Sequence, residues 1–348
     1  MLYEYTGNLH IHTTYSDGSG NIGDVVMAAK KAGIDFVGIT DHNTLQSYRE
    51  GKEGWYDDVL VLIGVELNTR YNHYLAFDVK EDIRDYTSNP QQTIDEVNKQ
   101  GGFGFMAHPF EKGSRLVFGG KAFTWNDWNV KGYTGISIWN YCSRWRDAAT
   151  SIVKGFYCYY INRNYQAGPD DETLRKWDEL TQTRKVVGIG CSDAHAHRVS
   201  YGFLKLTIFP YEYLFKTVNT HVLLGRPLKK DFHADKRMVY NALKRGHCFI
   251  GFDFYWNSRG FRYWAEKGKT RFLMGDGIDL SDDIVLKVEA PRMGIIRLIH
   301  NGKLILAKKE RFITYTVKHK GSYRVEVYSK GFLGSTHPWI YSNPIYIY

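Results

Sequence analysis

Apolar and polar positions follow a repeated strand-then-helix order along roughly the first 255 residues. Residues 7–13, "GNLHIHT", are typical of a strand, and residues 21–33, "NIGDVVMAAKKAG", have the apolar spacing of an amphipathic helix that ends at Gly33. Further strands are expected at 35–43, 57–68, 73–79, 103–110, 132–140 and 185–195, and further helices at 89–102, 170–183 and 236–246. This alternation predicts an α/β fold of mostly parallel strands covered by helices.

The pattern changes near the C-terminus. Short alternating segments are separated there by Gly, Asn and Lys turns, without helical spacing, at 283–290, 294–302, 312–317 and 321–329. They predict a small antiparallel β-sandwich. We therefore expect two domains, a larger one at 1–262 and a β-sandwich accessory domain at 263–348.

Two aromatic-rich segments, 111–130 and 142–170, lack a clear period. In an α/β protein such long insertions commonly shape access to a site.

Composition narrows the class of protein. The chain has 348 residues, 43% of them apolar, which is enough for a sizeable core. Its formal charge of +9 comes from 46 basic against 37 acidic residues, and the basic ones are scattered. We therefore expect anionic small-molecule substrates and no specific nucleic-acid groove. No apolar run approaches the roughly 20 residues of a membrane helix, and no secretion leader is visible, so a cytoplasmic location without membrane association is expected.

The four cysteines form no C-x-x-C pair. This argues against a thiolate zinc site and against a disulfide framework.

Residues able to bind a metal stand at the ends of most predicted strands of the first domain. They are His10, His12, Asp17, His42, Glu66, His73, His108, Asp193 and His195. The C-terminal ends of parallel strands open on one face, so these side chains are expected to converge. Two imidazoles at i and i+2 also share one side of a strand, which explains the spacing of His10 and His12.

Nine ligands are too many for one ion, which takes about four to six. We therefore expect two or three divalent ions of Mn²⁺, Fe²⁺ or Zn²⁺, because imidazole with carboxylate suits these metals. A carboxylate such as Glu66 is expected to bridge two ions that share an activated water or hydroxide. Hydrolysis of a phosphate ester is the reaction that most naturally needs this arrangement.

Simpler roles remain open for single residues. A lone His at a strand end often caps or hydrogen-bonds the core, and Asp17 in "SDG" also suits a turn. Asp41 is expected to cap a helix or to support a ligand rather than to bind metal itself.

The motifs "LHIHTTYSDGS", "GITDHN", "GVELN", "HYLAF", "AHP" and "GCSDAHAH" resemble, in this order, those of the PHP (polymerase and histidinol phosphatase) domain. The resemblance covers about residues 1–255 and implies a distorted (β/α)7 TIM-like barrel with a trinuclear metal site. The β-rich tail is similar to that of stand-alone CehA/McbA-type hydrolases.

The resemblance also implies how the ligands are grouped. His10, His12, Glu66 and Asp193 would hold one ion, and Glu66 would bridge to a second ion held by His73 and His108. The third ion would be held by Asp17, His42 and His195. This sequence departs from such relatives at Ser137, where they often carry Glu, and at Asp17, where some carry His.

Candidate substrate-binding residues follow the strand ends. Arg198 is the preferred cation for a phosphate, and the other candidates are Lys112, Arg115, Arg144 and Arg146. Trp125, Trp128 and Trp139 are candidates for stacking on a ring, although core packing explains them equally well. Asp193 and His195 are expected to help move a proton.

We therefore expect a metal-dependent phosphoesterase that hydrolyses a phosphomonoester or phosphodiester of a small molecule. Hydrolysis of carboxyl or carbamate esters, as in CehA-type relatives, is the alternative, and a non-catalytic binding module is a weaker one. The tail is expected to be an accessory domain, with a glycan site or a dimer surface as alternatives. The native substrate, the identity of the metal and the oligomeric state stay open.

Overall fold

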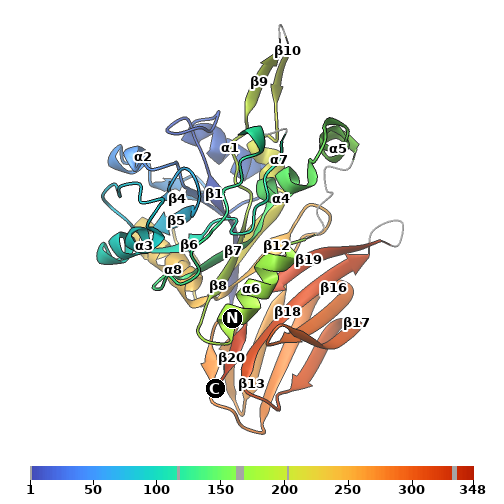
Figure 1. Ribbon diagram of the computed structural model, residues 1–348. Coiled ribbons are helices and arrows are strands. Elements are labelled where there is room, and N and C mark those ends of the chain that lie inside the picture. Colours follow the sequence, from blue (N-terminus) through green and yellow to red (C-terminus); the bar gives the residue numbers. More distant parts are fainter. Residues whose placement is uncertain (1, 116–117, 162–167, 202–203, 331–334) are drawn as a thin grey trace.

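The computed structural model describes residues 2–115, 118–161, 168–201, 204–330 and 335–348 (Figure 1). The strands that precede the C-terminal region are β1 (Tyr3–Ile11), β2 (Phe36–Ile39), β3 (Gly54–Tyr56), β4 (Val59–Leu67), β5 (Tyr74–Phe77), β6 (Phe103–Met106), β7 (Gly135–Asn140), β8 (Val187–Cys191), β9 (Arg198–Tyr201), β10 (Leu204–Thr207), β11 (Val218–Leu224) and β12 (Cys248–Phe252). The helices are α1 (Ile22–Ala32), α2 (Gln46–Arg49), α3 (Pro90–Lys99), α4 (Tyr141–Ala148), α5 (Ile152–Phe156), α6 (Asp171–Thr181), α7 (Tyr211–Phe215) and α8 (Phe232–Arg245), with short turns η1 (Phe118–Gly120) and η2 (Tyr157–Ile161).

The first part of the chain is a mixed α/β unit. Its strands are paired in the order β11, β1, β2, β4, β5, β6, β7, β8. The runs β1-β2-β4 and β6-β7-β8 are parallel, whereas β5 is antiparallel to both of its neighbours. The predicted α/β class is thus confirmed, with two antiparallel strands in this order, β5 and β11, that the alternating pattern did not reveal.

A closed (β/α)7 barrel stays a prediction. Between β8 and β1 the described residues form one isolated bridge, at Ile11 and Ala194, instead of a continuous ladder. Two hydrogen bonds accompany it, from His12 N to Ala194 O at 2.9 Å and from Ala194 N to His10 O at 3.0 Å. The bridge brings the segment after β8 against the end of β1, where the candidate ligands cluster.

Helix α1 shows how local sequence sets the element boundaries. Asn21 accepts a hydrogen bond from the backbone of Asp24, and Asp24 accepts one from the backbone of Asn21, which forms a capping box. At the other end Gly33 adopts φ 74°, a left-handed conformation that ends helices at little cost in glycine. The predicted helix at 21–33 is therefore confirmed almost to the residue.

Strand β4 is buried along its whole length, as its nearly continuous apolar run predicts. Alternate residues such as Val61 and Ile63 join the core beneath α1, while Leu60 and Leu62 join a second core on the opposite face. Glu66 follows on the same face as Leu60 and Leu62, because side chains alternate along a strand. An apolar strand thus places a carboxylate in the interior.

The C-terminal region consists of β13 (Arg262–Lys267), β14 (Thr270–Leu273), β15 (Gly277–Ile278), β16 (Ile284–His300), β17 (Lys303–Thr316), β18 (Gly321–Lys330), β19 (Thr336–Ser342) and β20 (Ile345–Ile347). These strands pair antiparallel, apart from β15 with β20, and surround their own core. The two strands expected at 283–290 and 294–302 form one long strand, β16, with an irregular register between Glu289 and Gly294.

The two parts of the chain are connected by hydrogen bonds. Strand β19 pairs antiparallel with β12, and Arg324 of β18 forms a two-pronged ion pair with Asp178 of α6, at 2.6 and 2.8 Å. Figure 1 shows α6 lying along the C-terminal strands. The division into domains at 262 and 263 stays a prediction.

The expected insertions contain more regular structure than their sequence indicates. Helices α4 and α5 lie within or next to 142–170, and η1 lies within 111–130. Parts of the two segments, 162–167 and 116–117, are outside the described residues. Strands β9 and β10 form a hairpin that projects from the molecule (Figure 1). Of these elements, α4 begins directly at the end of β7, on the side where the strand ends converge.

Candidate metal centre

His10 and His12, at the end of β1, point into one buried site. Both side chains are fully buried. Their Nε2 atoms lie 2.9 and 3.1 Å from Oε2 of Glu66, and 3.3 and 3.4 Å from Oδ1 of Asp193. Two imidazoles therefore face the same two carboxylates.

Glu66 is the centre of the cluster. Besides His10 and His12, its Oε2 lies 3.5 Å from Nδ1 of His42. Its Oε1 lies 2.8 Å from Nδ1 of His73 and 3.4 Å from Nε2 of His108. Five imidazoles thus surround one buried carboxylate, three on one oxygen and two on the other, which is the geometry expected of a bridging ligand.

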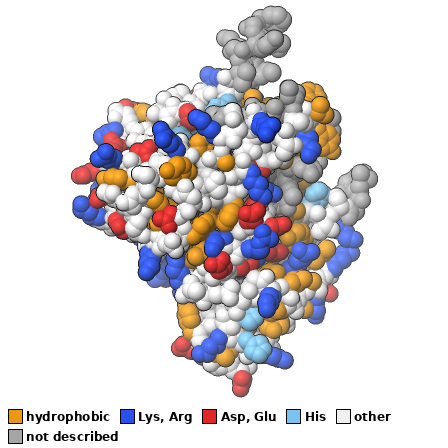
Figure 2. Space-filling model, viewed as in Figure 1, with side chains coloured by type: hydrophobic (Ala, Val, Ile, Leu, Met, Phe, Trp, Pro, Cys, Tyr) orange, Lys and Arg blue, Asp and Glu red, His pale blue; other side chains and the backbone are white. Residues whose placement is uncertain are grey.

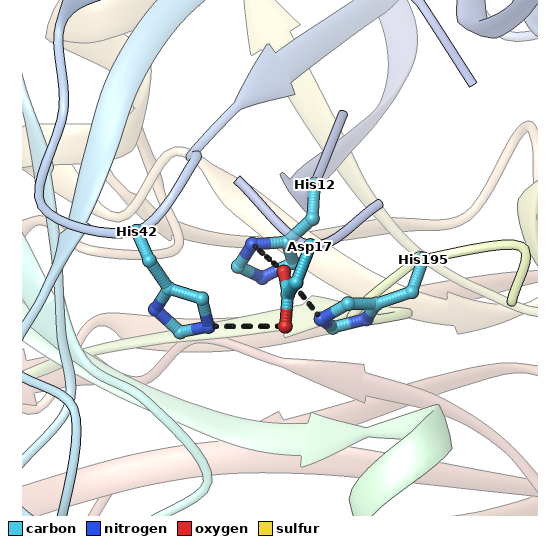
Figure 3. A group of neighbouring side chains, drawn as sticks. All are labelled: His12, Asp17, His42 and His195. Atoms are coloured by element: carbon cyan, nitrogen blue, oxygen red, sulfur yellow. Dashed lines mark ion pairs between the residues drawn. The ribbon is translucent and has the colours of Figure 1, made fainter. Parts of the chain in front are cut away.

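Asp17 occupies the middle of a second group (Figure 3). Its Oδ1 lies 3.5 Å from Nδ1 of His12 and 3.3 Å from Nε2 of His195, and its Oδ2 lies 3.8 Å from Nε2 of His42. His12 and His42 each offer one ring nitrogen to Asp17 and the other to Glu66. The two groups are therefore contiguous.

The loop that carries Asp17 is fixed by Asp41. The Asp41 carboxylate accepts hydrogen bonds from the Thr13 backbone, the Thr13 hydroxyl and the Ser16 hydroxyl, each at 2.7 Å. At Gly18 a Cβ atom would lie 2.2 Å from the carbonyl oxygen of His12, so only glycine permits this tight return of the chain. In the structure Asp41 orders the loop and does not face the clustered imidazoles.

Two candidate ligands have strained backbones. His108 has φ 28° and Asp193 has φ 59°, in the region that side chains other than glycine rarely adopt. Such strain persists where the surrounding structure over-determines it, and it is concentrated at functional sites. Asn140, which caps α4, lies with Nδ2 3.4 Å from Oδ2 of Asp193 and helps to hold that carboxylate.

The electrostatics of the cluster favour bound cations. Burial would raise the pKa of Glu66 and of Asp193, but the facing imidazoles, His10 first, lower both pKa values well below the ordinary range. Burial would likewise lower the pKa of His10 and His12, yet the same carboxylates raise it to about 9. At His42 burial dominates and lowers the pKa to about 4. The site thus stabilises positive charge beside its two innermost carboxylates.

Several ring nitrogens in the cluster lack a well-directed hydrogen bond, which fits the binding of metal ions. Among the described residues no partner with hydrogen-bond geometry exists for either nitrogen of His12, Nδ1 of His42, Nε2 of His73 or Nδ1 of His108, although carboxylate oxygens lie within 3.5 Å of both His12 nitrogens and of His42 Nδ1. Buried polar atoms are normally hydrogen-bonded, so such atoms in one cluster need explanation. Imidazole and carboxylate donors without thiolate match divalent transition metals.

His195 supports the same conclusion. Its Nδ1 lies 3.0 Å from the carbonyl oxygen of Asp193, and a carbonyl only accepts, so Nδ1 carries the proton in this contact. The lone pair of Nε2 then faces Oδ1 of Asp17. Nε2 of His195 and Oδ1 of Asp17 are then both acceptors, so a proton or a cation is needed between them. In metal sites the second nitrogen of a ligand imidazole is commonly oriented by a backbone contact, as Nδ1 of His195 is here.

All nine candidate ligands meet in this site. Ligand atoms that lie within 4.8 Å of one another form three groups, namely His10, His12, Glu66 and Asp193; His42, Glu66 and His73; and His12, Asp17, His42 and His195. The first group is the one that the resemblance implies. The other two groups differ from those that the resemblance implies. His42 takes the place of His108 in the second group, although His108 also lies beside Glu66, and His12 is added to the third group.

A cavity of about 370 Å³ opens onto the cluster. Besides seven of the candidate ligands, its lining includes Ser16, Thr69, Phe123 and Arg146. Arg146 is buried, pairs with the buried Glu111 at 3.0 Å, and lies over the Phe123 ring at 5.1 Å from its centre. Arg146 is thus the candidate cation that the structure places at the metal cluster.

The other candidate cations lie elsewhere. The Arg198 side chain is exposed and lines a separate hollow with Asp24 and Tyr211. Lys112 pairs with Asp170 and Glu172, each at 3.4 Å.

Arg144 pairs with the same aspartate, Asp170, at 3.2 Å. Arg115 is exposed in a turn. On the face drawn in Figure 2, basic side chains are interspersed with acidic ones, as the scattered charge predicts.

The three tryptophans singled out from the sequence pack against the protein itself. Trp125 donates from Nε1 to the carbonyl of Asp127, Trp128 stacks on Phe110, and Trp139 stacks on Phe252. None of the three lines a cavity at the cluster, as far as the described residues show.

Sequence reasoning missed Glu111, Phe123 and Trp145. The first two lie in a segment without a period. Trp145, by contrast, shares one face of α4 with Cys142 and Arg146 at helical spacing, a signal that was present in the sequence.

Ser137, where the sequence departs from some relatives, contacts a residue beneath the cluster. Its hydroxyl lies 3.1 Å from Sγ of Cys191, and that sulfur lies 3.9 Å from Nδ1 of His10. This strand therefore contributes to the surroundings of His10 rather than another carboxylate.

Comparison with known proteins identifies related chains. A model of the PHP domain family matches residues 8–200, a range that contains all nine candidate ligands. An uncharacterized protein of Methanocaldococcus jannaschii is 35% identical over 115 residues, which are 30% of this chain and 67% of that protein.

Two solved structures show a distant likeness. A two-domain protein of Bacteroides vulgatus, which contains a predicted PHP-like metal-dependent phosphoesterase, is 13% identical, with a TM-score of 0.45 over 97% of this chain and 95% of its own. A candidate metal-dependent phosphoesterase of Bifidobacterium adolescentis is 15% identical, with a TM-score of 0.37 over 58% of this chain and 92% of its own. No helix within the described residues has the length and apolarity needed to cross a membrane.

Proposed function

This chain belongs to the PHP domain family, and from that premise we propose that it is a metal-dependent phosphoesterase that hydrolyses phosphate esters of small molecules. The observation that carries the proposal is the position of Glu66, whose two carboxylate oxygens face five imidazoles within 3.5 Å. A carboxylate shared in this way fits a site with more than one ion, and such sites serve the in-line displacement at phosphorus.

The three groups of ligand atoms would hold two or three divalent ions, of Mn²⁺, Fe²⁺ or Zn²⁺. When bound, such ions supply an activated water for attack and neutralise the charge that builds on the phosphate.

Arg146 is proposed to orient the phosphate. Its guanidinium lies in the cavity wall, held by Glu111 on one side and by the carbonyl of Lys121, which accepts from Nη2 at 2.8 Å. A cation fixed in this way costs little entropy when it binds an oxyanion. Arg198, the cation preferred from its place in the motif, would need a ligand that extends to its own hollow.

His195, where its Nε2 holds no ion, and Asp193 are proposed to move the proton. The side chain of His195 is 15% exposed and lines the cavity, whereas those of His10 and His12 are fully buried. The Asp193 carbonyl fixes its orientation. A positioned imidazole of this kind suits proton transfer to a departing alcohol.

The test is a side-by-side assay of an aryl phosphate and an aryl acetate on metal-loaded protein. The proposal expects hydrolysis of the phosphate, inhibition by inorganic phosphate, and loss of both activity and bound metal in a His10→Ala/His12→Ala variant. Unchanged phosphate hydrolysis in that variant would overturn the proposal. Turnover of the acetate alone would replace phosphoesterase by carboxyl ester hydrolase, the alternative reaction for such a site.

A further inference from the structure

A second cavity adjoins the metal centre. It has a volume of about 140 Å³ and shares Arg146, Asp193 and His195 with the first. The rest of its lining is Cys142, Trp145, Ala196, His197, Ile208, Phe209 and Leu214, most of which is apolar. A molecule that fills both cavities would therefore have a polar end at the cluster and an apolar end beyond Arg146.

The walls of this second cavity are pre-formed. One wall is the face of α4 that carries Cys142, Trp145 and Arg146. The facing wall comes from residues 208–214, where the Phe209 ring meets Trp145 edge to face, with 5.0 Å between ring centres. Interlocked aromatic rings of this kind leave little freedom for the cavity to collapse.

Size and chemistry restrict the occupant. A protein cavity of roughly 150 Å³ lined by apolar side chains accommodates a benzene molecule. Two fused rings or a nucleoside would extend beyond this cavity. A sugar would bury several hydroxyl groups against Ile208, Phe209 and Leu214, which offer no hydrogen bonds, at a cost of several kcal/mol.

We propose that this cavity binds a single aromatic ring in the alcohol half of the substrate, so that the protein prefers phosphate monoesters of phenol-like or benzyl-like alcohols. This inference rests on the proposed phosphoesterase function. Hydrolysis breaks the P–O bond of the ester. Water supplies hydroxide to phosphorus and a proton to the departing oxygen, which gives inorganic phosphate and the ring-bearing alcohol.

Binding of non-hydrolysable phosphonates tests the inference without the influence of leaving-group reactivity. Benzylphosphonate, which replaces the ester oxygen of phenyl phosphate by a methylene group, is compared with methylphosphonate by calorimetry on metal-loaded protein. Burial of the ring predicts that benzylphosphonate binds tighter by a factor of about 10 to 100. Equal affinities would overturn the inference while leaving the phosphoesterase proposal standing.

Substitutions at Ile208 locate the effect. Ile208→Trp fills the cavity and is expected to remove most of the preference for benzylphosphonate, whereas Ile208→Ala enlarges it and is expected to weaken benzylphosphonate several-fold. Methylphosphonate affinity should stay unchanged in both, which also shows that each variant is folded. Leu304→Trp, on the exposed part of β17, is the matched control and should keep the full preference.

A preference that survives Ile208→Trp would overturn the assignment of the ring to this cavity. Failure of both phosphonates to bind would overturn the phosphate-binding role of the metal centre, and with it this inference.

Discussion

Glu111 and Arg146 form a buried ion pair, with 3.0 Å between Oε1 and Nη1, and Arg146 lies in the wall shared by the two cavities at the metal centre. The pair holds a positive charge next to the clustered imidazoles, where the ester would lie. The role of the Arg146 guanidinium in binding the phosphate can be tested by substitution.

Arg146→Ala is expected to lower kcat/KM for an aryl phosphate by about 10- to 100-fold, because a hydrogen-bonded charge contact with the phosphate is lost. Steady-state kinetics measure the effect. Arg144→Ala is the matched control on the same helix, since Arg144 pairs with Asp170 and is expected to leave the rate unchanged. Measuring Arg198→Ala in the same assay decides whether Arg146 or Arg198 binds the phosphate. Equal losses of kcat/KM in the Arg146 and Arg144 variants would contradict a phosphate-binding role for Arg146.

Glu66→Gln keeps the size of the side chain and removes its charge. Because Glu66 faces five imidazoles, we expect loss of more than one ion per chain and a fall in kcat of about a thousandfold. Elemental analysis of the purified variant measures the metal content.

Asp17→Asn is the companion variant. Asp17 belongs to one ligand group of the three, so its loss is expected to release a single ion. Equal metal loss in the Glu66 and Asp17 variants would contradict the central position of Glu66.

His221 provides a pH-dependent contribution to stability away from the metal centre. Its Nδ1 lies 3.0 Å from Oε1 of Glu4 and its Nε2 lies 3.1 Å from Oδ2 of Asp253. Burial would lower the pKa of His221, but Asp253 and Glu4 raise it to about 9. This stabilisation is complete below the unfolded pKa of about 6.5 and is lost as the pH rises through 9.

Urea unfolding of the metal-free protein checks this prediction. We expect His221→Gln to be less stable than the wild type by about 3 kcal/mol at pH 6, and expect the difference to shrink as the pH rises above 9. A difference independent of pH would mean that His221 contributes packing and not charge.

The Asp178–Arg324 ion pair is expected to couple α6 to the C-terminal strands. Arg324→Met leaves Asp178 and Glu326 buried without their cation and should cost about 3–5 kcal/mol in the free energy of unfolding. The double variant Asp178→Asn/Arg324→Met should recover part of this loss. Thermal and urea unfolding measure both, and an unchanged midpoint in Arg324→Met would refute the coupling.

Much of the site could be predicted because most of the ligands stand at or near the end of a recognisable strand. The alternation in 7–13 placed His10 and His12 on one side, and the apolar run before Glu66 predicted a buried carboxylate. These features depend on local periodicity and on the rule that parallel strands open at one end, which the sequence displays directly.

The remaining features depend on tertiary contacts. The antiparallel orientation of β5 was missed, because the sequence of a four-residue strand does not determine the direction in which it pairs with its neighbours. Arg198 adjoins a ligand motif in sequence, yet its side chain turns outward, whereas Arg146 reaches the cavity from α4. Trp139 stands at a strand end but packs on Phe252, because the opposite face of the sheet also needs filling.

The pairing of β19 with β12 has a consequence for self-association. Strand β12 is buried along its length and would present bare N–H and C=O groups if β19 were displaced. An exposed apolar edge of this kind is a template for intermolecular strand pairing and aggregation. The C-terminal strands thus cover an edge of the first part of the chain, and their detachment is expected to lower its solubility.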